Sequence, residues 1–373
     1  MKDIDAEIRE HTLQIIAGEV AKTAGCNAAA GTALVRALRK GELSDKDARE
    51  EAKGITYCTD ISSLIKNFSI KEIPQGSPAK VSIMDIIRGA MYGDIAGSRF
   101  EGKAVDRDRQ DLLDTDHTGC SLTDDSILTY ATYAAIRDLA PCYKWRRKYL
   151  AKGKPDLSCL KENSRYPFSE NPFSYYYLEY GNRFPDAGYG IGYTSWLREY
   201  GNNLKIPEPY GSCGNGSAMR VSPIGAVHFS QKDVIFLSAM SACATHSHFE
   251  GVKGAIVTAM CVFMAKEGYS KEQIRRYLIR HYSYGDVRFH DFTWDEAKRI
   301  ESTIVCQYTV PAAVISFLES TSFDDSIRKA ICVHYDTDTT ACVCGGIAAA
   351  YYGISEEKRT KVEKRLSNAQ LIW

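Results

Sequence analysis

The sequence predicts an all-α protein with a small helical appendage ahead of its main domain. Apolar residues recur at helical spacing over most of the chain, strand signals are few and short, and its 373 residues contain no internal repeat. A chain of this length can form two domains, or one large domain with an appendage. We expect a helical appendage and linker over residues 1–78 and a main domain over residues 79–373.

The elements follow from local patterns, taken in chain order. Apolar positions around Ile15 and Val20 and an alanine-rich run over residues 28–38 predict the appendage, and residues 74–78 (PQGSP) indicate a linker. Residues 141–210 are rich in Pro, Tyr and Asn, which predicts a long, partly irregular insertion at the surface or at the rim of a cleft. In the main domain, helical spacing predicts helices over residues 82–92, 126–139, 233–244, 251–267, 271–281, 310–319, 324–333 and 340–352.

Composition narrows the class of function. The chain carries 47 basic and 47 acidic residues, so its net charge is zero. This charge does not indicate non-specific binding to nucleic acid or to an acidic membrane surface. No apolar run approaches the roughly 20 residues that span a bilayer, and the first ten residues lack the order of a signal peptide. The 12 cysteines show no C-x-x-C spacing, which indicates reduced thiols. We expect a soluble, cytoplasmic protein with a small-molecule site and no membrane partner.

The first motif whose side chains could take part in catalysis or binding covers residues 89–101 (GAMYGDIAGSRFE). The pattern predicts a helix that runs into a glycine-punctuated turn bearing two carboxylates, Asp94 and Glu101, where glycine permits close backbone approach. Taken alone, a helix that stops at a glycine explains the motif better than a functional site does.

Two acidic motifs each precede an expected helix: residues 123–126 (TDDS) and residues 336–339 (DTDT). Helix capping explains either one alone, because a side-chain oxygen there satisfies the first N–H groups. Two carboxylates and a hydroxyl exceed what a cap requires, and hard oxygen ligands suit Mg²⁺ or Mn²⁺. Packing two such helix starts together without a cation would be costly.

Two further motifs could contact a ligand. The small residues of 214–220 (GNGSAMR) could cradle a diphosphate with their backbone amides, although a tight turn into a helix explains them equally well. Residues 244–248 (ATHSH) contain two histidines, His246 and His248. We expect these to contact ligand or orient loops rather than bind metal, because a hard-oxygen site does not favour imidazole.

In this order, with Gly188-Tyr189-Gly190 ahead of the glycine-rich motif, the five motifs resemble the ADP-ribosylglycohydrolase family over about residues 83–355. The resemblance implies an all-α fold around a cleft that holds two divalent metal ions, Mg²⁺ or Mn²⁺. It implies metal ligands at Thr123, Asp124, Asp125, Asp336, Asp338 and Thr339. We expect catalytic roles for Glu101 and Asp125, with Asp94 in support. The expected substrate contacts are Gly97, Ser98, Gly190, Gly214, Asn215, Gly216, Ser217, Met219 and His246.

The implied reaction is metal-dependent hydrolysis of the glycosidic bond that links ADP-ribose to a protein side chain or small acceptor, with release of ADP-ribose. Nucleic acid would enter only as an ADP-ribosylated substrate. One departure keeps an alternative open: His334-Tyr335 stand where family members usually carry Gly-Gly, and two large side chains could narrow the cleft. The alternatives are a non-catalytic ADP-ribose-binding or structural protein on the same fold, and a metal hydrolase that acts on a phosphoester or free nucleotide.

Overall fold

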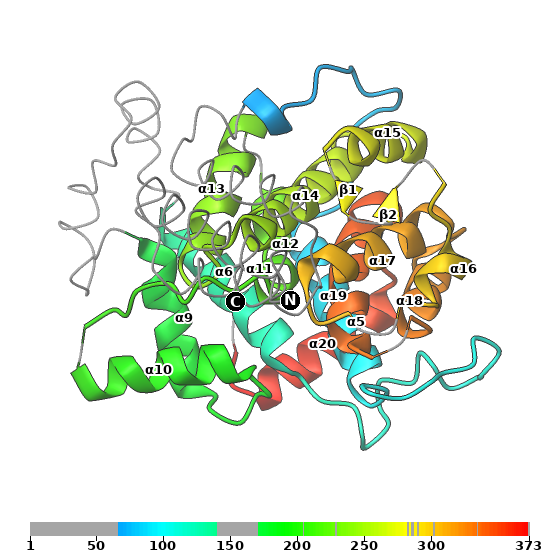
Figure 1. Ribbon diagram of the computed structural model, residues 1–373. Coiled ribbons are helices and arrows are strands. Elements are labelled where there is room, and N and C mark those ends of the chain that lie inside the picture. Colours follow the sequence, from blue (N-terminus) through cyan, green and yellow to red (C-terminus); the bar gives the residue numbers. More distant parts are fainter. Residues whose placement is uncertain are drawn as a thin grey trace, which may run out of the picture.

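A computed structural model describes residues 66–139, 171–203, 205–227, 230–281, 283–284, 287–288, 291–300, 303–333 and 335–371. Within these ranges the protein is all-α, as predicted, apart from one hairpin of two short antiparallel strands, β1 (Ser283–Tyr284) and β2 (Val287–Arg288) (Figure 1). None of the helices in these ranges is both long and apolar enough to span a bilayer. The expected appendage helices around Ile15 and over residues 28–38 lie outside the described residues.

Two antiparallel helices, α5 (Ile83–Ser98) and α19 (Thr337–Tyr352), pack against each other at the centre of the fold. Glycine permits their close approach: a Cβ added at Gly93 would lie 2.0 Å from the Ala341 carbonyl oxygen, and one at Gly89 would lie 2.2 Å from the Ala349 Cβ. Both distances are far below van der Waals contact. The two backbones can therefore approach this closely only where α5 carries glycine.

This packing corrects the interpretation of the first motif. The expected turn after residue 92 is wrong, because α5 continues through Gly93 and Gly97 to Ser98. The glycines serve helix packing and do not stop the helix. Asp94 consequently lies inside a helix with its side chain fully buried, and Glu101 follows in the turn beyond the helix end.

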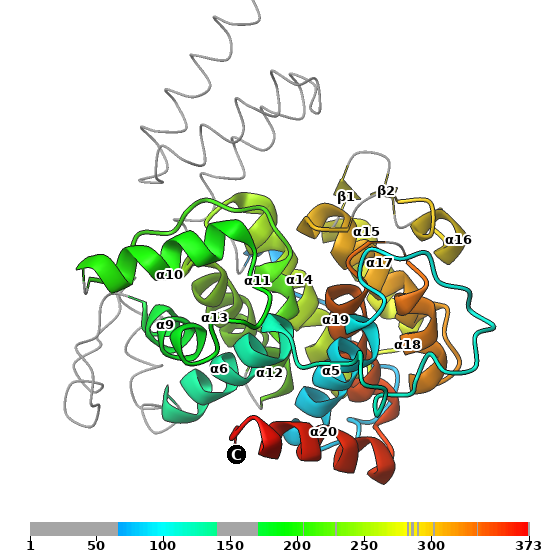
Figure 2. The same ribbon diagram turned by 90° about the horizontal axis from the view of Figure 1, so that it is seen from below.

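The other helices are arranged on both sides of this central pair (Figure 2). One group contains α6, α9, α10 and α13, and the other contains α15, α16, α17 and α18, while α14 lies between the groups and α20 contacts α5. Their bounds are α6 (Asp124–Leu139), α9 (Pro172–Arg183), α10 (Ile191–Asn203), α11 (Gly216–Met219), α12 (Ser222–Ala226), α13 (Gln231–Cys243), α14 (Phe249–Lys266), α15 (Lys271–His281), α16 (Trp294–Ala297), α17 (Cys306–Leu318), α18 (Phe323–Ile331) and α20 (Glu356–Asn368).

Most helices predicted from spacing are confirmed, with ends shifted by a few residues. α17 begins at Cys306 rather than at residue 310. Pro311 therefore lies inside the helix, where it provides no N–H for the Gln307 carbonyl. The described part of the expected insertion is more regular than its composition suggested, because it forms α9 and α10. Helix α20 was not predicted, since its charged sequence has only a narrow apolar stripe, with Val362 and Leu366 buried.

The segment over residues 66–80 is packed against the main domain. The Gly76 N–H donates to the Gly268 carbonyl at 3.0 Å, and the Ala79 N–H donates to the Lys266 carbonyl at 2.7 Å. Phe68 is buried in the core. The expected linker is thus held against the end of α14, and the division of the chain at residue 78 stays a prediction.

Candidate active site at two acidic helix starts

A side chain from α5 caps the start of α6. Asp94 accepts hydrogen bonds from the backbone N–H groups of Thr123 and Ser126, both at 3.1 Å, and from both of their hydroxyls. The first N–H groups of a helix have no acceptor within it, so a buried carboxylate there is stabilised by hydrogen bonds and by the helix dipole. Because Asp94 supplies this cap, the two aspartates that follow Thr123 are available for other contacts.

At the start of α19, capping does not explain the carboxylate. Asp336 occupies the N-cap position, yet its side chain makes no capping hydrogen bond. Its Oδ2 instead accepts from the Asn215 side-chain amide at 2.8 Å, and its backbone N–H donates to the Thr303 hydroxyl at 3.1 Å. These contacts connect the acidic motif to the glycine-rich motif, 121 residues earlier in the chain.

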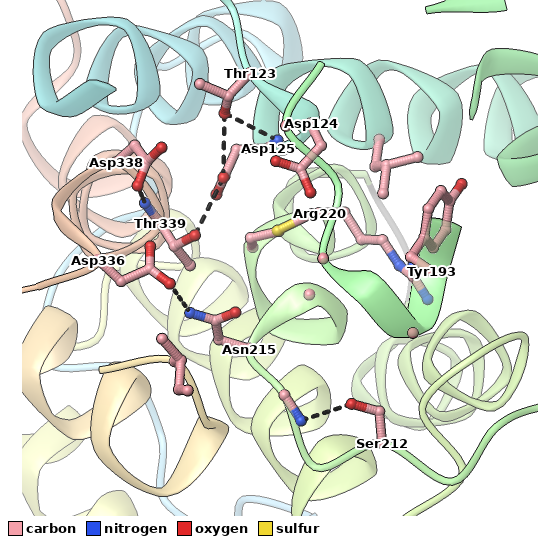
Figure 3. A pocket seen from close by; sticks show the side chains of 18 of the residues that line it. Thr123, Asp124, Asp125, Tyr193, Ser212, Asn215, Arg220, Asp336, Asp338 and Thr339 are labelled. Carbon is pink, nitrogen blue, oxygen red and sulfur yellow. Dashed lines mark hydrogen bonds between the residues drawn. The ribbon is translucent and has the colours of Figure 1, made fainter. Parts of the chain in front are cut away.

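The two helix starts meet at Asp125 (Figure 3). The Thr339 hydroxyl lies 3.1 Å from Asp125 Oδ2, and the Thr123 hydroxyl lies 3.3 Å from the same oxygen and 2.7 Å from Asp94 Oδ1. Ionised carboxylates only accept, so each threonine donates its single proton to a carboxylate. The Thr123 hydroxyl also accepts from the Asp125 N–H at 3.3 Å, which leaves it one lone pair, and both hydroxyls can still act as neutral oxygen ligands.

Three buried carboxylates crowd this point. Oxygen atoms of Asp94, Asp125 and Asp338 lie within 4.8 Å of one another. Burial raises the pKa of Asp94 to about 6, and it is the largest cause of the well-raised pKa values of Asp125 and Asp338, to which the neighbouring carboxylates add. The pKa of the partly buried Asp124 is raised to about 8 for the same two reasons.

This donor set fits hard divalent cations. Asp125 Oδ1 is buried and has no hydrogen-bond partner within the described ranges, and an unsatisfied carboxylate oxygen of this kind is costly. A cation would satisfy that oxygen and remove the repulsion among the carboxylates. Carboxylate and hydroxyl oxygens are also the ligands that Mg²⁺ and Mn²⁺ prefer. The three aspartates could therefore hold a metal ion.

The acidic groups open into a cavity of about 450 Å³, a size typical of small-molecule sites. Most of the expected site residues line it: Glu101, Thr123, Asp124, Asp125, Gly190, Gly214, Asn215, Gly216, Met219, His246, Asp336, Asp338 and Thr339. The fold thus brings expected site residues from six separate segments to one place.

Three expected substrate contacts do not line the cavity. Gly97 packs against the α19 backbone, where a Cβ would lie 2.6 Å from the Thr337 carbonyl oxygen. The Ser98 hydroxyl donates to the Ile95 carbonyl and accepts from the Ser121 N–H, each at 3.0 Å. Ser217 is fully buried and donates to the Gly251 carbonyl at 2.7 Å. These residues shape the walls behind the cavity rather than its surface.

The glycine-rich motif forms a loop that ends in the short helix α11. Gly214 makes a β-bridge with Val305, and the Asn215 N–H donates to the Ile304 carbonyl at 3.1 Å, so the segment before α17 fixes the loop. The Asn215 amide donates to Asp336 and to the Thr303 carbonyl. With both N–H groups engaged, this side chain presents its carbonyl oxygen to the cavity (Figure 3).

The two histidines have different roles, and neither belongs to the carboxylate cluster. His248 is the N-cap of α14, where its ring nitrogen accepts from the Glu250 N–H at 3.1 Å. His246 lines the cavity beside Gly214 and Gly216. The expectation that these residues orient loops or contact ligand, rather than bind metal, agrees with this placement.

Several cavity residues were not predicted. Tyr193, Tyr210 and Arg220 line the cavity, as do the exposed Ile191 and Ile304. The aromatic residues gave no signal because the chain has 23 tyrosines. Arg220 was visible as the last residue of the glycine-rich motif, and an arginine amid small apolar residues was the signal that could have identified it.

The arrangement of these motifs matches a known protein family. A sequence model of the ADP-ribosylglycohydrolase family matches residues 79–366. The chain belongs to this family. Its members are glycosidic-bond hydrolases, and the match covers every motif described above.

Curated members of the ADP-ribosylglycohydrolase family are similar to this chain over most of their length. The ADP-ribosylhydrolase ARH3 of Bos taurus is 26% identical over 321 residues, which cover 72% of this chain and 84% of the relative. The ARH3 of Gallus gallus is 26% identical over 350 residues, covering 75% and 88%. The ADP-ribosylarginine hydrolase Tri1 of Pseudomonas putida (strain GB-1) is 26% identical over 221 residues and covers 58% of each chain.

Tyr335 is one of the two residues before the last motif that depart from the expected family pattern, and its backbone is in the left-handed region. Its φ is +84°, a value that favours glycine, the residue that the resemblance to the family leads us to expect there. The side chain is 52% exposed and does not line the cavity, and the Tyr335 carbonyl accepts from the Gly102 N–H at 2.7 Å. Tyr335 therefore does not narrow the cavity, and His334 lies outside the described residues.

Proposed function

We propose that this protein hydrolyses the glycosidic bond between ADP-ribose and a protein side chain or small acceptor, and releases ADP-ribose with the help of two Mg²⁺ or Mn²⁺ ions. The observation that carries the proposal is the distribution of charge around the cavity. Asp336 and Asp338 lie on one side and the Arg220 guanidinium lies on the opposite side, while the glycine-rich loop contacts Asp336 through Asn215 (Figure 3). ADP-ribose has the matching pattern, with ribose hydroxyls at one end and a diphosphate further along.

The expected metal ligands are the six residues of the two acidic motifs: Thr123, Asp124, Asp125, Asp336, Asp338 and Thr339. Asp94 is not one of these six: its Oδ2 accepts three hydrogen bonds from the start of α6, so any contact of Asp94 with a cation would fall to Oδ1, which accepts one from the Thr123 hydroxyl. Its role is to orient Thr123 and the aspartate pair behind it. Bound divalent cations supply Lewis acidity and lower the pKa of coordinated water.

Glu101 is the proposed general acid or base. It lines the cavity from the turn after α5 and belongs to neither acidic motif. Partial burial raises the pKa of Glu101, and the charge of Asp336 adds to the rise. A carboxyl group with a raised pKa can hold a proton nearer to neutral pH, as departure of an acceptor from the anomeric carbon requires.

The opposite end of the cavity is suited to the diphosphate. The loop over residues 214–216 lines the cavity, but the Gly214 and Asn215 N–H groups already donate to the Ser212 hydroxyl and the Ile304 carbonyl, so the Gly216 N–H is the backbone donor of this loop that remains for a phosphate oxygen. A Cβ at Gly216 would lie 3.0 Å from the His246 ring, so a larger residue would displace the imidazole. Arg220 contributes a positive charge to the same cavity. Negative groups in the ligand are therefore favoured at this end and repelled at the carboxylate end.

The proposal is tested by mass-spectrometric detection of ADP-ribose released from arginine-, serine-, acetyl- and nucleic-acid-linked ADP-ribose, with Mg²⁺ and with EDTA. Release from one linkage, lost in EDTA, supports the proposal and identifies the acceptor. The appearance of AMP and ribose phosphate instead means cleavage of the diphosphate. Binding of ADP-ribose without release from any linkage favours the non-catalytic alternative.

A further inference from the structure

Arg220 is a fully buried arginine in the wall of the cavity. Its guanidinium carbon lies 3.8 Å from the centre of the Tyr177 ring, and its Nη2 donates to the Ser241 carbonyl and to the Thr245 hydroxyl, both at 2.8 Å. Within the described ranges, no ion pair joins it to a carboxylate, and its Nε and Nη1 have no hydrogen-bond partner. The positive charge of Arg220 is therefore not neutralised by an ion pair in this part of the chain, and it acts on the side chains beside it.

The Thr245 hydroxyl connects this charge to His246. Its oxygen accepts from Arg220 and lies 2.7 Å from Nδ1 of His246. A threonine hydroxyl has two lone pairs and one proton. With one lone pair accepting from the guanidinium, the proton can be donated to His246 Nδ1, and the nearby positive charge of Arg220 favours a lone pair over an N–H on that nitrogen. Acceptance from a cation also makes the hydroxyl a stronger donor, because hydrogen bonds in a chain polarise one another.

His246 is buried and lies at the glycine-rich loop. Its Nε2 lies 3.0 Å from the position of a Cβ at Gly216 and 3.5 Å from that of a Cβ at Gly214. Burial, and secondarily the charge of Arg220, holds the pKa of His246 well below its usual range, so the imidazole is neutral. A neutral imidazole has one N–H, and the partner of one nitrogen decides which nitrogen carries it.

We infer that Thr245, held by Arg220, is a positioning residue that fixes His246 as the Nε2–H tautomer. The ring then presents an N–H donor at the loop over residues 214–216, where an anionic oxygen of the ligand is expected. The opposite tautomer would present a lone pair there and repel such an oxygen. The inference rests on the proposed function only for the identity of the ligand, since the tautomer belongs to the protein alone.

The tautomer is tested directly in the wild-type protein by imidazole ¹⁵N chemical shifts and two-bond ¹⁵N–¹H couplings, with the His246 resonance assigned from its loss in His246→Gln. We expect a protonated Nε2 and an unprotonated, hydrogen-bonded Nδ1 at neutral pH. A protonated Nδ1, or an imidazolium, would overturn the inference. This result is independent of whether ADP-ribose binds.

The functional consequence is tested with a matched pair, Thr245→Val and Thr245→Ser. Valine keeps the shape but removes the hydroxyl, so we expect the Nε2–H tautomer to lose its preference and the Kd for ADP-ribose to rise about fivefold to tenfold, as the loss of one hydrogen bond predicts. Serine keeps the hydroxyl and should restore both. A KM effect that exceeds the kcat effect is expected, since the residue acts on binding.

A second pair of variants changes His246 itself and leaves the hydrogen bond between Arg220 and Thr245 in place. In His246→Gln the side-chain amide can place an N–H near the position of Nε2, whereas in His246→Asn the shorter amide reaches only as far as Nδ1. We expect glutamine to retain binding within about threefold and asparagine to lose about tenfold, one good hydrogen bond. Equal affinities in both pairs, with wild-type binding intact, refute the inference alone. Absence of ADP-ribose binding by the wild type refutes the proposed function instead.

Discussion

Removal of one charge from the carboxylate cluster should stabilise the metal-free protein while abolishing turnover. In Asp125→Asn the carbonyl oxygen can still accept from Thr123 and Thr339, and the new amide replaces the unpartnered Oδ1 among the oxygens of Asp94 and Asp338. Each N–H donated to a charged carboxylate contributes about 1.5–3 kcal/mol. We expect metal-free stability at pH 8 to rise by about 2 kcal/mol.

The gain in Asp125→Asn is compared with the free energy of unfolding that the metal-free wild type loses as the pH rises. Raised carboxyl pKa values mean that the folded state binds more protons than the unfolded state. The contribution of these groups to the free energy of unfolding is therefore fully present below about pH 4, and it is lost as the pH rises through the folded pKa. For Asp94, a pKa of about 6 in place of 3.8 corresponds to about 3 kcal/mol. The other raised carboxylates extend the loss toward pH 8 and beyond.

The assay is urea unfolding in EDTA between pH 5 and 8, repeated with excess Mg²⁺. Wild type should lose stability across this window in EDTA and regain it with Mg²⁺, whereas Asp125→Asn should show a flatter profile and little response to Mg²⁺. The exposed Asp108, converted to Asn, is the matched control and should behave as wild type. A wild-type profile that is flat in EDTA, or an Asp125→Asn protein less stable than wild type at pH 8, would refute the reasoning.

Three further predictions follow from particular contacts. Glu101→Gln should lower kcat at least 100-fold with ADP-ribose affinity kept within about threefold, and equal losses in a turnover assay and a binding titration would argue against an acid–base role. Asn215→Leu removes the amide donors to Asp336 and should weaken Mn²⁺ binding about 10–100-fold in a calorimetric titration, so unchanged affinity would show that this support is dispensable. Gly93→Ala should cost at least about 2 kcal/mol in urea unfolding, whereas Gly201→Ala, which meets open space, should be neutral or slightly stabilising; similar values for the two would contradict the close packing of α5 on α19.

Much of the site could be predicted because its chemistry is concentrated in short motifs. Residues 123–126 and 336–339 each place two carboxylates and a hydroxyl at a helix start, and the fold brings the two starts together at Asp125. The pattern of oxygen ligands predicted a hard divalent cation, and the three aspartates that lie together could bind a metal ion. What spacing alone did not show was which carboxylate caps a helix and which is left for a ligand.

Asp94 shows why that distinction required the structure. Its motif is rich in glycine, which ordinarily indicates a turn, but the glycines lie on the face of α5 that packs against α19. The tertiary contact therefore overrides the low helix propensity of glycine. Once the helix continues, Asp94 points toward the start of α6 and becomes its cap.

Ser217 and Arg220 show the same effect at the other end of the cavity. Their motif indicated ligand contacts, but the short helix α11 turns Ser217 inward to the Gly251 carbonyl, while Arg220, just beyond the helix, lines the cavity. The helical phase of α11 decides which side chains face the ligand. A four-residue helix is too short for apolar spacing to reveal that phase.

We propose that the two acidic helix starts hold divalent cations on which glycosidic cleavage depends. The most direct test is to strip the protein with EDTA, add back Mn²⁺ in steps, and record bound metal by equilibrium dialysis alongside ADP-ribose release from the best substrate. We expect activity to return as the bound metal approaches two ions per chain, and Asp338→Asn to bind less metal and stay inactive. Full activity in the stripped protein, or metal bound equally well by Asp338→Asn, would contradict this proposal.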